Sequence, residues 1–284
     1  MVDGSTMEGG GQVIRLSCAL AALVGTRLHL HSIRAKRSKP GLARQHLTGL
    51  KLAADMCGGR EEGSGGAGVL LGAAVGATEI LFDPSSARAS VDANSAGTAQ
   101  TDFKANTGGA GSLMLVLQIA LPIALFCDGG RVLSMQLEGG TNASMAPPLD
   151  FFVGVLAPLL RQHCGITLQI ETARRGYFPQ GGGAVNVQVD RKAYLQGKAL
   201  DPILLGGYRG RVVSIGGVAC TGGGVSAAEA EAMLAAATAV LRQRLEAAER
   251  LGAVAAAAVG HEIAGAAGVG AIEPPPIEVS LDVD

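Results

Sequence analysis

The run Glu8-Gly9-Gly10-Gly11-Gln12 leads directly into an apolar helical pattern, and a basic stretch follows at residues 33–46, with the sequence IRAKRSKPGLARQH. A glycine-rich turn before a helix exposes backbone N–H groups that can bind anions. The basic stretch holds six cationic or imidazole side chains (Arg34, Lys36, Arg37, Lys39, Arg44 and His46). Because paired guanidinium groups can hold phosphate oxygens, the two runs together predict a polyanion site.

The composition restricts how such an anion could be bound. The 284 residues carry a formal net charge of −1, so any contact with nucleic acid must be local. The five cysteines are widely spaced and form no CxxC pair, which favours free thiols in a reducing compartment. The longest apolar run, Leu113 to Cys127, is too short to cross a bilayer. The sequence therefore predicts an intracellular protein without membrane contact, in the nucleus if the organism is a eukaryote and otherwise in the cytoplasm.

One order of elements occurs twice along the chain. The first repeat, about residues 1–90, is predicted to run helix, strand, helix, strand, strand (Gln12–Val24, Arg27–Ile33, Gln45–Cys57, Val69–Leu71 and Thr78–Phe82). The second, about residues 91–200, returns to that order (Gly111–Phe126, Arg131–Leu137, Leu149–His163, Thr167–Glu171 and Ala184–Val189). We therefore expect an α/β (α+β) fold for residues 1–200, in which repeated βα units place helices on one face of small sheets.

Residues 201–284 do not complete a third repeat. They are predicted to hold a strand (Arg211–Ile215), a long helix (Ser226–Leu251) and a terminal strand (Ile277–Val283). The Ala/Gly tract from Gly252 to Gly270 has the composition of a low-complexity tail. This part is either a small appended α/β domain or a domain cut short.

Several side chains have both a structural and a functional reading. Glu8 could favour the helix dipole or bind a divalent metal, and Arg15 could lie at the edge of its helix or have a fixed anionic partner. Gln118, polar within an apolar run, could hydrogen-bond in the core or contact a ligand. In residues 174–179 (RRGYFP), two cations precede two aromatic side chains, which could stack a base or simply pack. The chain has no Walker A loop, zinc spacing or GxSxG elbow.

These runs, in order, resemble the RNA 3′-terminal phosphate cyclase family. The resemblance rests on Asp3-Gly4 with the glycine turn, on residues 33–47, on Gly139–Asn142 with Ala146-Pro147, and on residues 175–183. The family is identified over roughly residues 1–190. It implies transfer of AMP from ATP through a histidine to an RNA 3′-phosphate, after which the 2′-OH closes a 2′,3′-cyclic phosphate. It also implies that residues 201–284 are part of an inserted domain.

The resemblance also implies roles for particular residues. Glu8 is expected to contact a divalent metal, Mg or Mn. Four side chains are expected to hold phosphates of ATP or of the RNA end (Arg15, Arg34, Arg37 and Gln45). Gln118 and Pro147 are expected to border the nucleotide. ATP and an RNA with a 3′-terminal phosphate are the expected partners.

The family's nucleophilic histidine belongs to a later motif that this chain does not match. None of its five histidines (His29, His31, His46, His163 and His261) occupies the corresponding place, and the resemblance treats His46, beside the anion site, as structural. The chain is therefore expected to be truncated before that motif, and the resemblance leaves open whether it is active. The alternative is a non-catalytic, RNA-binding homologue that acts in ribosome biogenesis.

Overall fold

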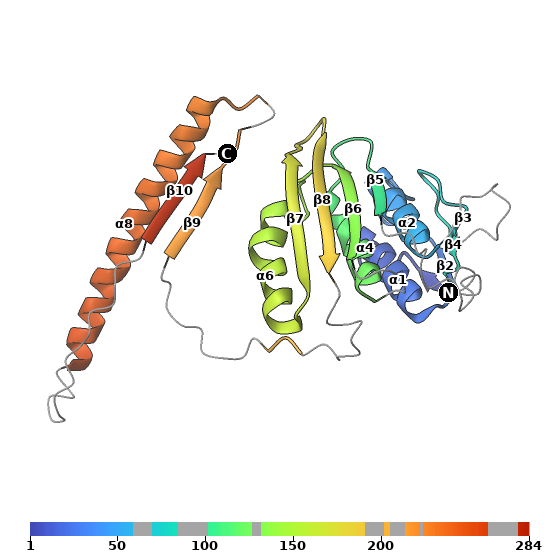
Figure 1. Cartoon of the computed structure of the whole chain (residues 1–284), viewed down its shortest axis with the longest axis horizontal. Helices are drawn as coiled ribbons and strands as arrows, with labels where there is room; N and C mark the ends of the chain where they lie inside the picture. The colour runs from blue at the N-terminus through green and yellow to red at the C-terminus, as the bar shows by residue number, and fades with distance from the viewer. Residues whose placement is uncertain are drawn as a thin grey trace. The chain divides into compact units, whose positions relative to one another are not determined.

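The computed structural model describes residues 1–58, 70–84, 102–126, 132–190, 202–204, 214–221, 224–260 and 278–283. The chain divides into two bodies, Met1–Leu205 and Gly206–Asp284 (Figure 1). The N-terminal body contains both predicted repeats.

The first repeat forms a four-stranded sheet with two helices. Its elements are β1 (Val2–Asp3), α1 (Gly11–Val24), β2 (Leu28–His31), α2 (Arg44–Met56), β3 (Leu70–Leu71) and β4 (Ile80–Phe82). The strand order is β1-β2-β4-β3, in which β1 and β2 are parallel and the other pairs antiparallel. Helix α1 ends where the sequence predicts, because Gly25 adopts a left-handed φ of 69° and its N–H caps the carbonyl of Ala21.

The second repeat has the same topology. It comprises β5 (Asp102–Asn106), α4 (Leu113–Phe126), β6 (Val132–Gly139), a helical run of α and π turns (α5, Leu149–Phe151; η1, Phe152–Leu156; α6, Ala157–Leu159; η2, Leu160–Cys164), β7 (Thr167–Arg174) and β8 (Gly183–Asp190). Its order is β5-β6-β8-β7, with β5 and β6 parallel and the other pairs antiparallel. The predicted fold class is confirmed. The predicted element order is wrong in one respect, because each repeat begins with a strand, β1 or β5, that was not predicted.

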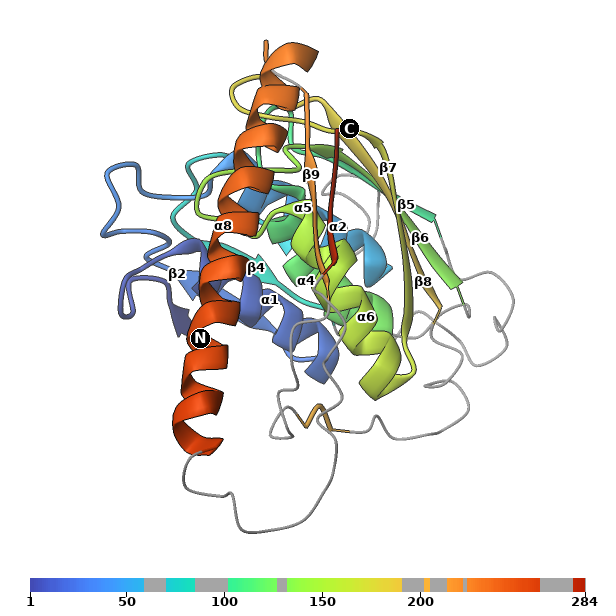
Figure 2. The same ribbon diagram turned by 90° about the vertical axis from the view of Figure 1, so that its left-hand side faces the viewer.

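Helices cover one face of the second sheet, and α4 joins the two repeats. Strands β6 and β8 alternate in burial, and Leu133, Met135 and Val187 face the core. Figure 2 shows α4 and α6 on the same side of this sheet. Ile119 and Ile123 of α4 pack into the core of the first repeat, and α4 also contacts α1 and α2. The joint core therefore fixes the two repeats against each other.

The C-terminal body contains β9 (Ser214–Ala219), α8 (Ala227–Gly260) and β10 (Glu278–Val283). Strands β9 and β10 pair in parallel and α8 contacts both, so the three elements form a βαβ unit. Ser226 and Glu229 cap the first turn of α8 reciprocally. Helix α8 continues through residues 252–260, so the start of the Ala/Gly tract is helical. Among the residues that the structure describes, no helix is long and apolar enough to cross a membrane.

Candidate phosphate and nucleotide site

The first glycine turn, at the start of α1, is the centre of the candidate site. A Cβ added to Gly11 would lie 2.4 Å from Nε2 of His46 and 3.0 Å from Nη1 of Arg15. A Cβ added to Gly10, the N-cap of α1, would lie 3.0 Å from Nη2 of Arg37. Because these positions carry no side chain, two guanidinium groups and an imidazole can approach the backbone at a helix N-terminus, where anions bind.

Glu8 and Arg37 face each other beside this turn. Nη2 of Arg37 lies 3.5 Å from Oε2 of Glu8, and the Glu8 side chain is 88% exposed. An exposed pair of this kind contributes at most about 1 kcal/mol. Lys36 borders the same turn, because its Nζ donates to the carbonyl of Met7 over 3.1 Å. A phosphate could therefore replace Glu8 as the partner of Arg37 at little cost.

Arg15 and Gln118 are brought together from helices α1 and α4. Nε of Arg15 donates to Oε1 of Gln118 over 2.8 Å, and burial lowers the pKa of the guanidinium. The protein partner that the structure shows for Arg15 is therefore an amide oxygen and not a carboxylate. Because an amide leaves the positive charge uncompensated, Arg15 keeps its capacity to attract an anion.

His46 is a buried, neutral donor in the first turn of α2. The residue is 5% exposed, and its Nδ1 accepts the N–H of Ala43 over 3.1 Å. Burial, followed by the charges of Arg34 and Arg15, lowers the pKa of His46 to about 4. The ring is therefore uncharged near pH 7, and its proton is assigned to Nε2, the nitrogen that lies against the glycine turn. Sequence reasoning placed His46 beside the site but did not anticipate this donor.

Arg34 shapes the basic loop between β2 and α2. It adopts a left-handed φ of 53°, and its Nη1 donates to the carbonyl of Gly41 over 2.9 Å. Gly41 has φ of 83°, and a Cβ there would lie 2.2 Å from the carbonyl oxygen of Gly76. The end of the loop at Gly41 and Leu42 is therefore packed, while residues 35–40 are exposed.

Three consecutive residues at the start of α2 reach glycine turns of both repeats. While His46 faces Gly11, Gln45 accepts the N–H of Ser112, ahead of α4, over 3.1 Å. Arg44 donates from Nη1 to the carbonyl of Gly108 over 3.1 Å. The amide oxygen of Gln45 is thus used within the protein, and its Nε2 is the end that can donate to a ligand oxygen.

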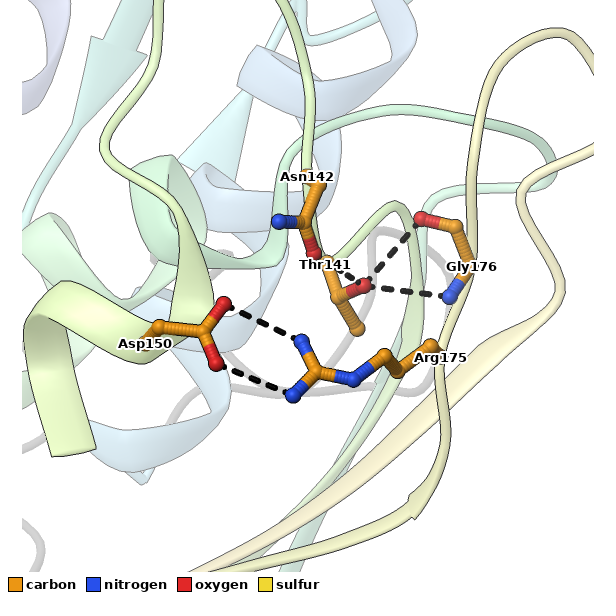
Figure 3. Close-up of polar contacts among 5 residues, drawn as sticks. All are labelled: Thr141, Asn142, Asp150, Arg175 and Gly176. Atoms are coloured by element: carbon orange, nitrogen blue, oxygen red, sulfur yellow. Dashed lines mark hydrogen bonds and ion pairs between the residues drawn. The ribbon is translucent and has the colours of Figure 1, made fainter. Parts of the chain in front are cut away.

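Pro147 lies in the connection between β6 and α5. Thr141 and Asp150, on either side of Pro147 in the chain, bond the two residues that follow β7 (Figure 3). Arg175 donates to both carboxylate oxygens of Asp150, over 2.9 and 3.0 Å. Thr141 is fully buried, and its Oγ1 bonds both the N–H and the carbonyl of Gly176. The hydrogen bonds of Arg175, with burial opposing them, lower the pKa of Asp150. The sequence indicated Thr141, Arg175 and Gly176 only as parts of motifs and did not single out Asp150, and it gave no sign that these residues pair.

The described residues contain no cluster of three or more His, Cys, Asp and Glu side chains that could hold a metal ion. Glu8 could still contribute to a metal site in which the substrate supplies most of the ligands. Mg²⁺ commonly binds through one or two carboxylates together with substrate phosphates. Glu8 thus places one carboxylate beside the first glycine turn.

The fold and this geometry define a duplicated α/β protein with a candidate anion site at the first glycine turn. A family model described as RNA 3′-terminal phosphate cyclase matches residues 6–265. The chain belongs to this family.

Several relatives carry that family's name. An RNA 3′-terminal phosphate cyclase of Nitrosospira multiformis is 45% identical over 189 residues, which are 66% of this chain and 47% of that protein. One of Desulfurococcus amylolyticus is 38% identical over 211 residues, 74% of this chain and 51% of that protein. One of Archaeoglobus fulgidus is 37% identical over 202 residues, which are 71% of this chain and 54% of that protein. The chain thus spans about half the length of these relatives, and their bacterial and archaeal origin lends no support to a nuclear location.

Proposed function

We propose that this chain provides the phosphate-holding part of an ATP-dependent RNA 3′-terminal phosphate cyclase. The observation that carries the proposal is the convergence of Arg15, Arg37 and His46 on bare glycine backbone at the N-terminus of α1. Phosphoryl transfer needs charge neutralisation and positioning more than covalent help. This turn supplies both.

In the proposed reaction, ATP provides the AMP that activates the RNA 3′-phosphate, and pyrophosphate leaves. The neighbouring 2′-oxygen then attacks the 3′-phosphorus, AMP leaves, and a 2′,3′-cyclic phosphate remains. Arg37 and Arg15 hold phosphate oxygens at the turn, and Arg34 and Gln45 support them from the basic loop and the start of α2. Glu8 is the carboxylate for a divalent metal, Mg or Mn, bound together with the phosphates.

Gln118 and Pro147 border the nucleotide in this proposal. Gln118 reaches the site through Arg15, to which it is hydrogen-bonded. Pro147 lies in the loop that the Arg175–Asp150 pair secures. Because none of the chain's histidines matches the family's nucleophile, we propose that the isolated chain binds these phosphates without forming a stable protein–AMP adduct.

Binding of matched RNAs tests the proposal. A short single-stranded RNA ending in a 3′-phosphate should bind more tightly than the same RNA ending in a 3′-hydroxyl, as measured by fluorescence anisotropy. Arg37→Ala should weaken binding of the phosphorylated RNA roughly 10- to 100-fold, since it removes charge-assisted hydrogen bonds.

Arg161→Ala is the matched control, because Arg161 is an exposed arginine in η2, at the far end of the helical run from Pro147. It should change neither affinity by more than about two-fold, within the range of a distant surface charge. Equal affinities for the two RNA ends, or equal effects of the two substitutions, would refute the phosphate site. Acid-labile labelling of the chain by ATP would refute the absence of an adduct.

A further inference from the structure

The turn between β7 and β8 presents an exposed aromatic side chain that the phosphate site does not use. Phe178 is 83% exposed in a chain with only six phenylalanines and three tyrosines. A single exposed apolar side chain is common on protein surfaces and needs no explanation. The reason to consider Phe178 lies in the support beneath it and in its neighbours.

The turn that carries Phe178 is held at both of its ends. Tyr177 pairs with Asn142 and with Gly181, whose N–H donates to the carbonyl of Tyr177 over 2.7 Å. The two residues before Tyr177 are those held by Asp150 and Thr141 in Figure 3. An aromatic ring on a fixed turn loses little conformational entropy when a ligand stacks on it.

A chain of close contacts connects this turn to the phosphate site. A Cβ added to Gly181 would lie 2.2 Å from the carbonyl oxygen of Gly109, so the β7–β8 turn rests on the second glycine turn, residues 108–111 before α4. The carbonyl of the preceding residue, Gly108, accepts the hydrogen bond from Arg44. Arg44 is the first residue of α2, two positions before His46. Phe178 and the phosphate site therefore lie on adjoining loops of one body.

A cation lies beside the Phe178 turn and another lies at the start of α2, and their charge has the sign that a nucleic-acid backbone requires. Arg44 and Arg174 are both exposed, and Arg174 is anchored to the carbonyl of Gly182 in the same turn as Phe178. Single-stranded nucleic acids bind where cations follow the backbone and aromatic rings stack the bases. Both components are present here within a few residues.

We propose that Phe178 is a stacking platform for a nucleobase of the single-stranded RNA that precedes the terminal phosphate. Arg44 and Arg174 neutralise the connecting phosphodiesters. The inference rests on the proposed function, since it extends the RNA away from the phosphate site. The competing occupant with the same chemistry is the adenine of ATP.

The test compares Phe178→Ala and Phe178→Trp in the full chain. The ligands are a 3′-phosphorylated RNA of about ten nucleotides, the same RNA with one abasic ribose at each of the last four positions in turn, a nucleoside 3′-phosphate, and ATP. Phe178→Ala should weaken binding of the intact RNA about 5- to 100-fold, the range for loss of one base–aromatic stack. Phe178→Trp should retain the affinity. At one abasic position, wild type and Phe178→Ala should bind equally, because the stacked base is then missing from both.

The nucleoside 3′-phosphate and ATP should bind equally to wild type and Phe178→Ala. The stacking site is refuted if Phe178→Ala leaves RNA affinity unchanged, if its effect persists at every abasic position, or if it weakens ATP and not RNA. Failure of the proposed function looks different, because Arg37→Ala would then leave binding of the nucleoside 3′-phosphate unchanged whatever Phe178 does. Since the ring is exposed, both variants should unfold at the wild-type temperature, which circular dichroism checks.

Discussion

Protonation of His46 should destabilise the N-terminal body within a defined pH window. The pKa of His46 is about 4 in the folded chain and 6.5 at its ordinary value. Because the folded-state pKa is the lower one, the unfolded chain binds this proton more readily between the two values. Stability therefore rises with pH from about 4 to about 6.5, and is lost as the solution is acidified through that window. The full difference corresponds to roughly 3 kcal/mol.

His46→Asn is the perturbation that isolates this effect. Asparagine does not titrate, and its side-chain oxygen can accept the Ala43 N–H that now bonds Nδ1 of His46. Urea unfolding of both proteins should be followed between pH 7 and pH 4.5. Relative to the variant, the wild type should lose roughly 2 kcal/mol over that range. The charges that act on the ring, those of Arg34 and Arg15, are unchanged in the variant.

The reasoning is refuted if the two unfolding free energies fall in parallel as the pH drops. It is also refuted if an NMR titration of the His46 ring protons gives a pKa near the ordinary value of 6.5. Either result would mean that water reaches the ring, or that a bound anion neutralises the charges of Arg15 and Arg34. In that case His46 would be a cationic, not a neutral, donor at the glycine turn.

Two further predictions concern the β7–β8 turn and the Arg175–Asp150 ion pair next to it. A double-mutant cycle with Arg175→Ala and Asp150→Ala should give a coupling of about 1 kcal/mol at pH 7, because Asp150 is half exposed and solvent screens the pair. The coupling should vanish at pH values well below 3.8, as Asp150 becomes protonated; a coupling that is absent at pH 7 contradicts it. Gly182→Ala, with φ of 71° and open space around the added Cβ, should cost about 1 to 2 kcal/mol. Gly181→Ala, with φ of 72°, should cost roughly a further 1 to 3 kcal/mol, because its Cβ would collide with the carbonyl of Gly109. If thermal unfolding shows equal losses of stability for the two variants, the β7–β8 turn does not contact the glycine turn at Gly109.

Periodicity predicts most of the helices and strands of this fold, and it fails where a strand is too short or too polar. The helices α1, α2 and α4 follow apolar spacing and end near the residues expected. Strand β1 has two residues, Val2–Asp3, and no periodicity can be read from so few. Strand β5, Asp102–Asn106, has polar residues at three of its five positions, and its pairing with β6 supplies the order that its own sequence lacks.

The sequence indicated several residues of the candidate site but not the contacts between them. The basic stretch and the glycine turn indicated Arg37, Glu8 and an anion. The hydrogen bond between Arg15 and Gln118 joins residues 103 positions apart, and it exists because α1 packs on α4. The low pKa of His46 likewise depends on burial and on two arginines that tertiary packing places nearby. Neither can be derived from spacing along the chain.

The duplication explains why residues 1–50 alone give an incomplete picture of the site. Each repeat places a glycine-rich turn between its first strand and first helix, and the two turns meet at the start of α2. There a helix directs consecutive side chains about 100° apart, so His46 can face the first turn while Gln45 and Arg44 face the second. A phosphate held at the first turn, as proposed, would therefore be tied to the position of the second turn and, through it, to the β7–β8 turn. Changes at Gly181 should consequently alter RNA affinity as well as stability, although Gly181 lies far from Arg37 in the sequence.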